Sequence, residues 1–259
     1  MWIAITRDVS PALAACELSF VERSAIDVQR AQVQHDGYCR ALESLGCEVI
    51  TLPAEAAFPD SVFVEDVALA FDEVAIATRP GAESRRDEGG AVLEVLGSVR
   101  RLLRIEAPGT LDGGDVLRIG KRVFVGISAR SNAAGREQLR ELLAPFGYTV
   151  EGVATRDCLH LKSAVTQVGA NTVLLNPAWL ADARPFAGYA CIEVDPSEEH
   201  AANAVRVGDA LLYPECFPKT LERLRSAGIA VTTVDVSELQ KAEGAVTCCS
   251  LLFKTEGAP

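Results

Sequence analysis

Residues 115–128 read DVLRIGKRVFVGIS, in which two short apolar stretches flank a bend at Gly120. Branched apolar residues on both sides of a glycine are typical of a β-hairpin, because glycine readily adopts the backbone conformation of a tight turn. The pattern recurs, with Gly, Asp or Asn at each bend, in VALAFDEVAIAT (67–78), SAVTQVGANTVLLN (163–176) and NAVRVGDALLYP (203–214). We therefore expect a β-hairpin that repeats along the chain.

A helix and a further strand are expected after the hairpins. NAAGREQLRELLAPFG (132–147) has helical character and is followed by the apolar YTVEGV. FPKTLERLRSAG (217–228), which precedes IAVTTV, has Pro218 in the first turn of its expected helix and Gly228 at the end. Proline is tolerated where a helix starts, and glycine favours the turn that ends one. The predicted repeating unit is hairpin, helix, strand.

The hairpin starts recur with a regular spacing. Asp66, Asp115, Ser163, Asn203 and Cys249 lie 49, 48, 40 and 46 residues apart, which is typical of a repeat architecture. The last run, AVTCCSLLFK, lacks a second strand, and MWIAIT at the N-terminus can supply it and close five units into a ring. In such a ring all hairpin starts face one central cavity. A doubly wound parallel sheet fits less well, because turns this short leave no room for crossover helices.

Composition narrows the class of protein. The 259 residues are 49% apolar, which suffices for a sizeable core, and we expect one domain over 1–259. The net charge of −11 disfavours a nucleic-acid partner and attracts cationic ligands. No stretch has the length and apolarity of a membrane helix, and no signal peptide is evident, so we expect a cytoplasmic protein without a membrane partner. The eight cysteines form no C-x-x-C pair, which argues against a structural zinc site and a disulfide framework.

Carboxylates gather at the first two hairpin starts. FPDSVFVEDVALA contains Asp60, Glu65 and Asp66, and GTLDGGDVL contains Asp112 and Asp115 around two glycines. The glycines allow a neighbour or a ligand to approach the backbone closely. Each acid taken singly is typical of a solvated cap beside a turn. Together on one axis, the acids predict an anionic pocket.

The three histidines have different surroundings. His35 lies on the apolar stripe of a helix expected within SAIDVQRAQVQHDGYCRALESLG (24–46), and we interpret it as a hydrogen-bonded packing residue. His200 lies in a polar loop. His160, in DCLHLKSAV, lies at the third hairpin start. A lone strand histidine is more often structural, but a position opposite the cysteine pair favours a Cys/His pair.

The fifth hairpin start, VTCCSLLF, contains Cys248 and Cys249. Successive side chains of a strand point to opposite faces, so we expect one cysteine in the cavity and the other in the core. This makes a metal clamp awkward and a disulfide between the two strained, and it favours a sulfur nucleophile backed by a packing cysteine. Arg85 and Arg130 follow the first two hairpins, where they could grip a carboxylate beside the pocket.

Several motifs occur together, in the order DSVFVED (60–66), TRPGAESRR (78–86), LDGGDVL (111–117), LHLKS (159–163), AAN (201–203) and TCCS (247–250). In these motifs the chain resembles, nearly end to end, the dimethylarginine dimethylaminohydrolases, which are guanidine-modifying enzymes with a five-bladed β/α-propeller (pentein) fold. The resemblance implies hydrolysis of asymmetric dimethylarginine and monomethylarginine to citrulline and dimethylamine or methylamine, through a cysteine thiouronium intermediate. It also implies a small cationic guanidino substrate, no metal, no organic cofactor, and a monomer or homodimer.

The resemblance assigns roles to particular residues. Cys248 matches the nucleophile, His160 the general acid/base, and Asp112 the acid that orients them. The positions matched to substrate binding are Asp60, Glu65 and Asp66 for the head group, Arg85 and Arg130 for the α-carboxylate, and Leu18 and the backbone of Ala242 as lid and pocket contacts.

Two alternatives remain open at this point. An arginine deiminase would share the pocket and the nucleophile, although the TCCS ending favours the dimethylarginine branch. A non-catalytic propeller would use its cysteines and His160 to bind zinc or to pack. For an enzyme, nearby carboxylates should hold the pKa of Cys248 above its usual value of about 8.5, and a cationic substrate should lower it.

Overall fold

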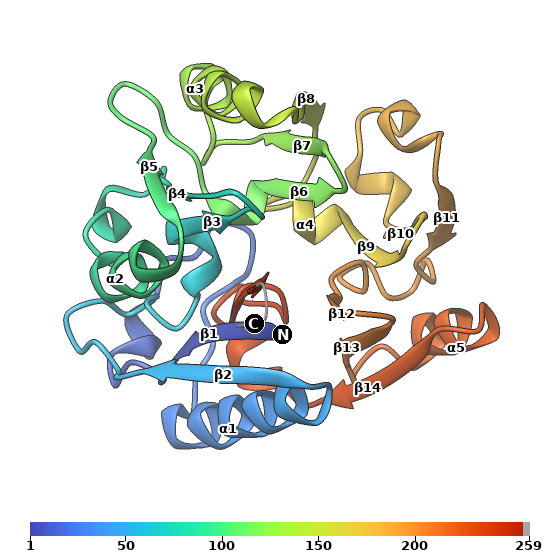
Figure 1. Cartoon of the computed structure of the whole chain (residues 1–259). Coiled ribbons are helices and arrows are strands. Elements are labelled where there is room, and N and C mark those ends of the chain that lie inside the picture. Colours follow the sequence, from blue (N-terminus) through green and yellow to red (C-terminus); the bar gives the residue numbers. More distant parts are fainter. Residues whose placement is uncertain (256–259) are drawn as a thin grey trace.

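Five three-stranded sheets are arranged in a ring (Figure 1). The structure is a computed structural model and describes residues 1–255. The sheets are, in order of pairing, β15-β1-β2, β3-β4-β5, β6-β7-β8, β9-β10-β11 and β12-β13-β14. The strands are β1 Trp2–Arg7, β2 Cys47–Leu52, β3 Ala68–Ala70, β4 Val74–Ala77, β5 Arg101–Arg104, β6 Val116–Ile119, β7 Arg122–Ile127, β8 Thr149–Ala154, β9 Val165–Gly169, β10 Thr172–Leu175, β11 Ala190–Glu193, β12 Val205–Val207, β13 Ala210–Pro214, β14 Ala230–Val234 and β15 Leu251–Lys254. The predicted five-bladed β/α-propeller is confirmed.

The third blade shows the repeating unit. β6 pairs with β7 in antiparallel orientation, and β7 pairs with β8 in parallel orientation. The helix α3 (Ala133–Leu143) joins β7 to β8. The Asn132 side chain caps its start by accepting from Gly135 N, and Gly147, with φ +75°, turns the chain after it, because glycine tolerates the left-handed conformation. The predicted order of hairpin, helix and strand is therefore correct here.

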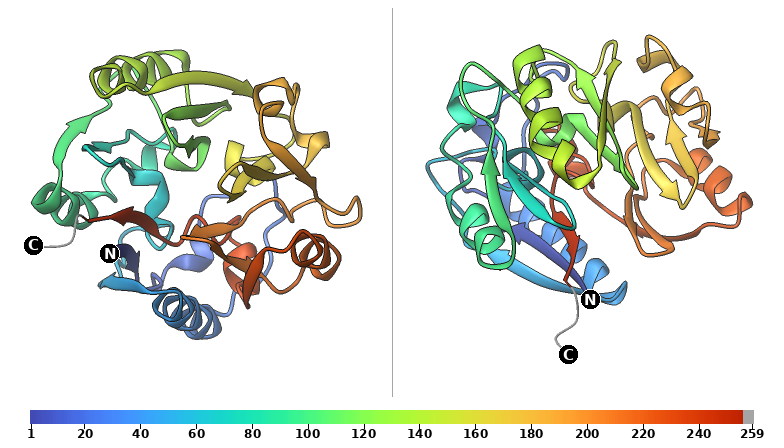
Figure 2. Two further views of the ribbon diagram at one scale, coloured as in Figure 1. Left: turned by 45° about the vertical axis from the view of Figure 1, so that its right-hand side comes forward. Right: turned by 45° about the horizontal axis from the view of Figure 1, so that its top comes forward.

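Helices of eight or more residues lie at the periphery of the ring, outside the sheets (Figures 1 and 2). These are α1 (Val28–Ser44), α2 (Gly90–Val99), α3 and α5 (Pro218–Ser226). The shorter α4 (Leu161–Ala164) and α6 (Ser237–Gln240) occur in loops. No helix within residues 1–255 combines the length and the apolar character needed to cross a membrane.

The fourth blade departs from the predicted unit. Its third strand, β11, is reached through two 3-10 turns, η6 (Pro177–Trp179) and η7 (Arg184–Phe186). Proline lacks a backbone N–H and stops helix propagation, and each of these turns contains one near its start. The missing helix agrees with the shortest repeat spacing, the 40 residues between Ser163 and Asn203.

The two ends of the chain close the ring, as predicted. β1 pairs with β15 in antiparallel orientation, with Trp2 opposite Lys254, and with β2 in parallel orientation. β15 follows the fifth hairpin start, and no second strand comes after it in the sequence. Ring closure gives β15 the strand β1 as its partner.

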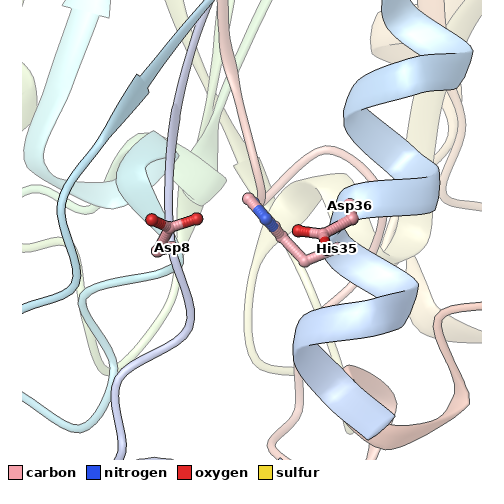
Figure 3. Close-up of side chains that lie close together, drawn as sticks. All are labelled: Asp8, His35 and Asp36. Carbon is pink, nitrogen blue, oxygen red and sulfur yellow. The ribbon is translucent and has the colours of Figure 1, made fainter. Parts of the chain in front are cut away.

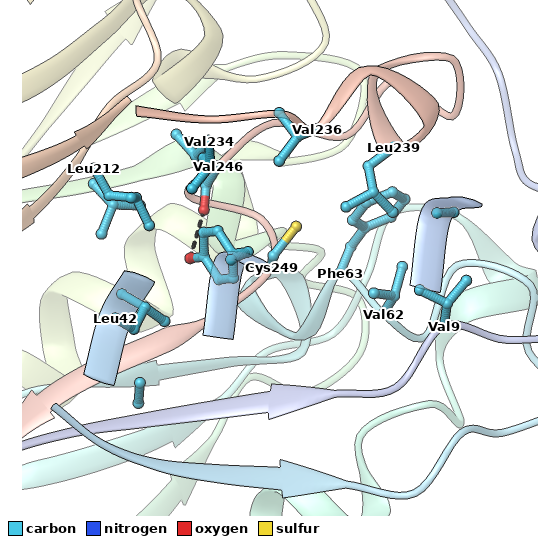
Figure 4. Close-up of a cluster of buried hydrophobic side chains, with 14 of the residues drawn as sticks. Val9, Leu42, Val62, Phe63, Leu212, Val234, Val236, Leu239, Val246 and Cys249 are labelled. Carbon is cyan, nitrogen blue, oxygen red and sulfur yellow. Dashed lines mark hydrogen bonds between the residues drawn. The ribbon is translucent and has the colours of Figure 1, made fainter. Parts of the chain in front are cut away.

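The apolar stripe of α1 packs against the last blade (Figure 4). Ala31, His35, Tyr38 and Leu42 are buried, as the periodicity predicts. The Tyr38 hydroxyl lies 2.8 Å from Val246 O and 2.7 Å from Ser250 Oγ. This helix therefore braces, through one buried phenol, the loop that contains the cysteine pair.

Candidate active site

A small cavity opens where the hairpin starts meet the loop before β15. Its volume is about 20 Å³, which leaves room for only one or two water molecules. The lining residues are Glu17, Asp60, Phe63, Asp66, Arg85, Arg130, Leu159, His160, Ala242, Glu243, Gly244 and Cys248. The structure thus brings seven of the predicted site residues to one cavity: Asp60, Asp66, Arg85, Arg130, His160, Ala242 and Cys248.

Two glycines allow the elements around the cavity to approach one another. A Cβ on Gly113 would come within 1.9 Å of Glu65 O, and one on Gly114 within 2.4 Å of His160 Nδ1. Gly114 N donates to Asp66 Oδ1 at 2.9 Å. The expectation that these glycines permit close approach is confirmed, and the short turn η4 (Gly113–Asp115) could not lie here with larger residues.

His160 is buried among carboxylates. Its Nε2 lies 3.0 Å from Asp112 Oδ2 and 4.0 Å from Asp66 Oδ1. Burial lowers the pKa of His160, but Asp66, Asp112 and Asp115 outweigh burial and raise the pKa to about 9. Burial raises the pKa of Asp66, but the positive charges of His160 and Arg85 outweigh burial and hold this pKa below its usual value. At neutral pH the pair is therefore an imidazolium beside a carboxylate.

Cys248 presents a thiol to the same cavity. Burial, followed by the charges of Glu65 and Asp66, raises the pKa of Cys248 to about 12. The direction agrees with the prediction, but burial contributes more than the carboxylates to which the prediction attributed it. The sulfur is thus protonated at neutral pH, and any nucleophilic role requires that a positive charge arrive nearby.

The two cysteines divide as predicted, but the predicted strand geometry is wrong. Residues 246–249 form a turn, and β15 begins only at Leu251. The backbone groups of this turn form hydrogen bonds with other blades and not with a neighbouring strand: Thr247 N donates to Asn203 Oδ1, and Cys248 O accepts from Glu65 N. Cys249 is fully buried in the core shown in Figure 4, whereas Cys248 is half-buried and lines the cavity.

Glu65 does not line the cavity. One of its carboxylate oxygens accepts from Lys162 Nζ, and the other accepts from Thr247 Oγ1 at 2.9 Å. Lys162 was not among the predicted site residues. These three residues also line a wider opening of about 950 Å³, so the Glu65–Lys162 pair lies between that opening and the loop of Cys248.

The two predicted arginines differ in how far their donors are already used. Arg85 is buried, and it donates to Asp66 at 2.6 Å and to Glu88 at 2.9 Å. Burial raises the pKa of Glu88 to about 7 despite the guanidinium beside it. Arg130 is less committed, because its Nη2 lies 3.3 Å from Ser19 Oγ and its Nη1 3.9 Å from Asp112. Arg130 is therefore the arginine with donors to spare for a ligand.

Asp115 and Asp112, the two acids at the second hairpin start, are hydrogen-bonded within the protein. Asp115 is fully buried and accepts from Ser128 Oγ, Ser131 Oγ and Leu161 N, so it fixes the start of α4 just after His160. Asp112 contacts His160 and accepts from Gly81 N at 2.8 Å. Neither residue is among those that line the cavity.

The segment 10–27 contributes Glu17 to the lining of the cavity. Asp60 Oδ2 accepts from Glu17 N at 3.1 Å, and burial raises the pKa of Asp60. Leu18 is half-buried against the core that is shown in Figure 4, and it is not one of the lining residues, whereas its neighbour Glu17 is. Sequence reasoning missed the lining residues Glu17, Phe63, Leu159, Glu243 and Gly244. Phe63 and Leu159 lie within the quoted motifs 60–66 and 159–163 but are apolar, and the other three lie outside the repeated hairpins.

Among residues 1–255, two clusters have ligand atoms within 4.8 Å of one another, close enough to share a cation. One is Asp66, Asp112 and His160 in the cavity wall. The other is Asp8, His35 and Asp36 (Figure 3). In the second cluster the Gln32 amide already donates to both carboxylates, at 3.1 and 2.8 Å, so it explains that cluster without an ion.

His35 packs in the core, as predicted, but its hydrogen bonding is weaker than expected. Its Nδ1 lies 3.8 Å from Cys39 Sγ, and its Nε2 has no partner within residues 1–255. Burial lowers the pKa of His35. The ring is therefore neutral at pH 7 and serves as a packing group.

The ring of five three-stranded blades, with Cys248, His160 and carboxylates around one cavity, is the arrangement of the pentein fold of guanidine-modifying proteins. Residues 15–252 match the family described as N,N dimethylarginine dimethylhydrolase, eukaryotic. The N(G),N(G)-dimethylarginine dimethylaminohydrolase of Streptomyces coelicolor is 40% identical over 252 residues, covering 97% of this chain and 96% of the relative. The one from Pseudomonas aeruginosa is 37% identical over 229 residues, covering 88% and 90%. The chain belongs to the dimethylarginine dimethylaminohydrolase family.

Solved structures agree with this assignment. A Cys-to-Ser mutant of the Pseudomonas aeruginosa enzyme complexed with citrulline superimposes with a TM-score of 0.93 at 35% identity, covering 98% of this chain and 100% of that one. The N-terminal domain of ArgZ, an arginine dihydrolase from Cyanobacteria, has a TM-score of 0.84 at 17% identity, covering 97% and 98%. The second likeness shows the shared fold alone.

Proposed function

We propose that the protein hydrolyses N-omega-methylated arginines, asymmetric dimethylarginine and monomethylarginine, to citrulline and the corresponding methylated amine. The observation that carries the proposal is that the Cys248 thiol, the His160 imidazole and the Asp66 carboxylate line one buried cavity. A planar guanidinium needs carboxylate acceptors in its plane and a nucleophile above its central carbon. This cavity offers both kinds of group. Membership of the dimethylarginine dimethylaminohydrolase family indicates which reaction these groups would carry out.

Binding would prepare the nucleophile. The guanidinium charge offsets the carboxylates that raise the pKa of Cys248, so the thiol releases its proton to solvent water as the cation arrives. The thiolate then adds to the guanidinium carbon and forms a neutral tetrahedral adduct. Asp112, at 3.0 Å from His160 Nε2, holds the imidazolium in place for the next step.

His160 would act first as an acid and then as a base. The imidazolium, whose pKa is about 9, gives its proton to the methylated nitrogen, and the C–N bond breaks to leave a thiouronium on Cys248. The neutral imidazole then takes a proton from water, and hydroxide adds to the same carbon. The second adduct expels the thiolate, which takes up the hydroxyl proton of the departing product; this restores the Cys248 thiol and leaves citrulline.

Substrate ends can be assigned in the same way. Asp66 and Asp60 would face the guanidinium side of the substrate, and Arg130 would bind the α-carboxylate because its donors are the less committed ones. Glu65 would act indirectly, through the Lys162–Glu65–Thr247 chain beside Cys248. All of these groups lie on one chain.

A paired assay tests the proposal. Purified protein is incubated with asymmetric dimethylarginine or with arginine, and citrulline, dimethylamine and ammonia are measured. The proposal predicts dimethylamine and citrulline in equal amounts, with a higher kcat/KM for the methylated substrate. Citrulline from arginine alone would instead make the protein an arginine deiminase, and citrulline from neither would refute guanidine hydrolysis.

A further inference from the structure

The wider opening beyond the Glu65–Lys162 pair lies in the centre of the ring. Its volume is about 950 Å³, which is within the range of sites that hold small molecules. It is lined by β15 and by the first strands of the other blades, β3, β6, β9 and β12, which surround the middle of the ring in Figure 1. Every blade therefore contributes to one concave surface, which we call the central opening.

The central opening has the opposite charge to the protein as a whole. The chain has a net charge of −11, yet five cations and three acids line this opening. The cations are Arg100, Arg118, Lys162, Arg206 and Lys254, and the acids are Glu65, Asp72 and Asp209. A cleft lined by one sign of charge with apolar walls focuses its electric field and concentrates ions of the opposite sign. The charge of this opening therefore favours an anionic ligand.

Two of the cations, Lys254 and Arg206, have little competition from acids. Lys254 forms no ion pair within residues 1–255, and its Nζ lies 4.9 Å from the centre of the Trp2 ring. Arg206 has one acid partner at 3.3 Å, Asp209, whose side chain is fully exposed. The Arg206 Nε is buried and has no hydrogen-bond partner in the part of the chain that the structure describes. A buried donor without an acceptor is unfavourable, so a bound anion would stabilise this guanidinium.

Both cations lie close to Trp2, which also lines the central opening. Trp2 is the β1 partner of Lys254 in β15. Its Nε1 lies 3.9 Å from the position that a Cβ on Gly208 would occupy, and Gly208 is in the turn of the β12–β13 hairpin that carries Arg206. The indole thus brings apolar surface to the place where the two cations meet, which suits an organic anion.

The other three cations already have partners. Arg118 donates to both carboxylate oxygens of Asp72, at 2.9 Å each, and Lys162 is paired with Glu65. Arg100 donates to backbone carbonyl oxygens, those of Phe71, Val99 and Lys254. The donors that a ligand can use most readily are therefore those of Lys254 and Arg206.

We propose that the central opening binds a small multivalent oxyanion, whose anionic oxygens accept from Lys254 and Arg206. The two cations come from different blades, so a ligand with two or more anionic groups can contact both. Phosphate and carboxylate groups both provide this chemistry. The inference goes beyond the proposed function and does not depend on it, because the Glu65–Lys162 pair separates this site from the loop of Cys248.

Calorimetry with inorganic triphosphate and with citrate tests the proposal on the full chain at low salt. We expect one anion to bind per chain, and the tighter of the two identifies the preferred group. Arg206→Gln and Lys254→Gln should each weaken binding about 3- to 5-fold, and the double variant about 10-fold or more. Arg206→Lys keeps the charge and should keep most of the affinity. Circular dichroism and thermal unfolding establish that each variant is folded, and the exposed Lys254 decides the outcome if Arg206→Gln does not fold.

Two control variants locate the bound anion. Arg184→Gln makes the same charge change at an exposed arginine outside the central opening, and it should leave affinity unchanged. Arg130→Gln removes the arginine of the smaller cavity and should also leave affinity unchanged. The proposal would be overturned if neither anion bound at millimolar concentration, or if Arg184→Gln weakened binding as much as Arg206→Gln. Loss of binding in Arg130→Gln with normal binding in the Arg206→Gln, Lys254→Gln double variant would place the anion in the cavity of Cys248 and would equally overturn it.

Discussion

His160 Nε2 lies 3.0 Å from Asp112 Oδ2, and the two residues are 48 positions apart in the sequence. One blade lies between them in the sequence, so the packing of neighbouring blades rather than local sequence brings them together. The contact gives the histidine a fixed orientation and a raised pKa. The raised pKa keeps a proton on the ring for a leaving amine, and the fixed orientation holds the neutral ring in place to take a proton from water afterwards.

The cysteine pair gives a direct comparison. Cys248→Ser should lower kcat by at least about 1,000-fold, because the step that forms the covalent intermediate is lost. Cys249→Ser should keep most activity and instead lower the free energy of unfolding by about 1–3 kcal/mol, since it places a hydroxyl in an apolar core. Citrulline assays and urea unfolding of both variants check this. An inactive Cys249→Ser beside an active Cys248→Ser would reverse the assignment.

His160 should make stability depend on pH. Its folded-state pKa is raised from 6.5 to about 9, so its charged form stabilises the fold fully below pH 6.5, and this contribution is lost as the pH rises through 9. The unfolding free energy of the His160→Gln variant is subtracted from that of the unmodified protein, which removes the contributions of titrating groups that both proteins share. The difference in unfolding free energy should shrink by about 3 kcal/mol between pH 6.5 and 9. A difference that is constant across this range would mean that the histidine is not charged in the folded protein.

The buried pair Glu65–Lys162 should behave as a unit. Lys162→Met leaves a buried carboxylate without its cation, and it should lower the free energy of unfolding by about 3–5 kcal/mol. The double change Glu65→Gln, Lys162→Met removes both charges and should recover much of that loss. Urea unfolding of the two single variants and the double variant measures the coupling. Additive losses in the double variant would show that the two residues do not interact in solution.

The two cavity arginines should separate stability from binding. Arg85→Gln removes the cation beside the buried Glu88 and one of the two cations beside Asp66, the other being His160, so it should lower the free energy of unfolding by about 3 kcal/mol or more. Arg130→Gln should leave stability nearly unchanged but raise KM about 10-fold or more, because a donor pair for the substrate carboxylate is lost. Thermal unfolding and steady-state kinetics distinguish the two effects. A destabilised Arg130→Gln with normal KM would contradict the assignment.

Features with a local signal could be predicted from the sequence. The hairpins, the helix 28–44 and the ring closure by the two terminal strands follow from periodicity, turn residues and an unpaired last strand. Polar pairing across blades has no such signal. Lys162 meets Glu65 and Glu243 meets residues 19–21 only after the ring has closed.

The turn at the cysteine pair illustrates the limit of local patterns. VTCCSLLF reads as a continuous strand because its residues are apolar, yet only Leu251–Lys254 pairs with β1. Asn203 and Glu65, from other blades, take the backbone bonds of Thr247 and Cys248. Tertiary hydrogen bonds therefore overrode strand propensity at the residue on which the chemistry depends.

The most direct measurement is the thiolate absorbance of Cys248 as a function of pH, with the Cys248→Ser protein as the blank for the other cysteines and the tyrosines. In the free protein the pKa should lie far above that of an ordinary thiol, at about 12. A slowly reacting cationic guanidino ligand should lower it, because the added charge offsets Glu65 and Asp66. A pKa that stays the same or rises when the ligand binds would contradict the claim that the substrate's own charge activates the nucleophile.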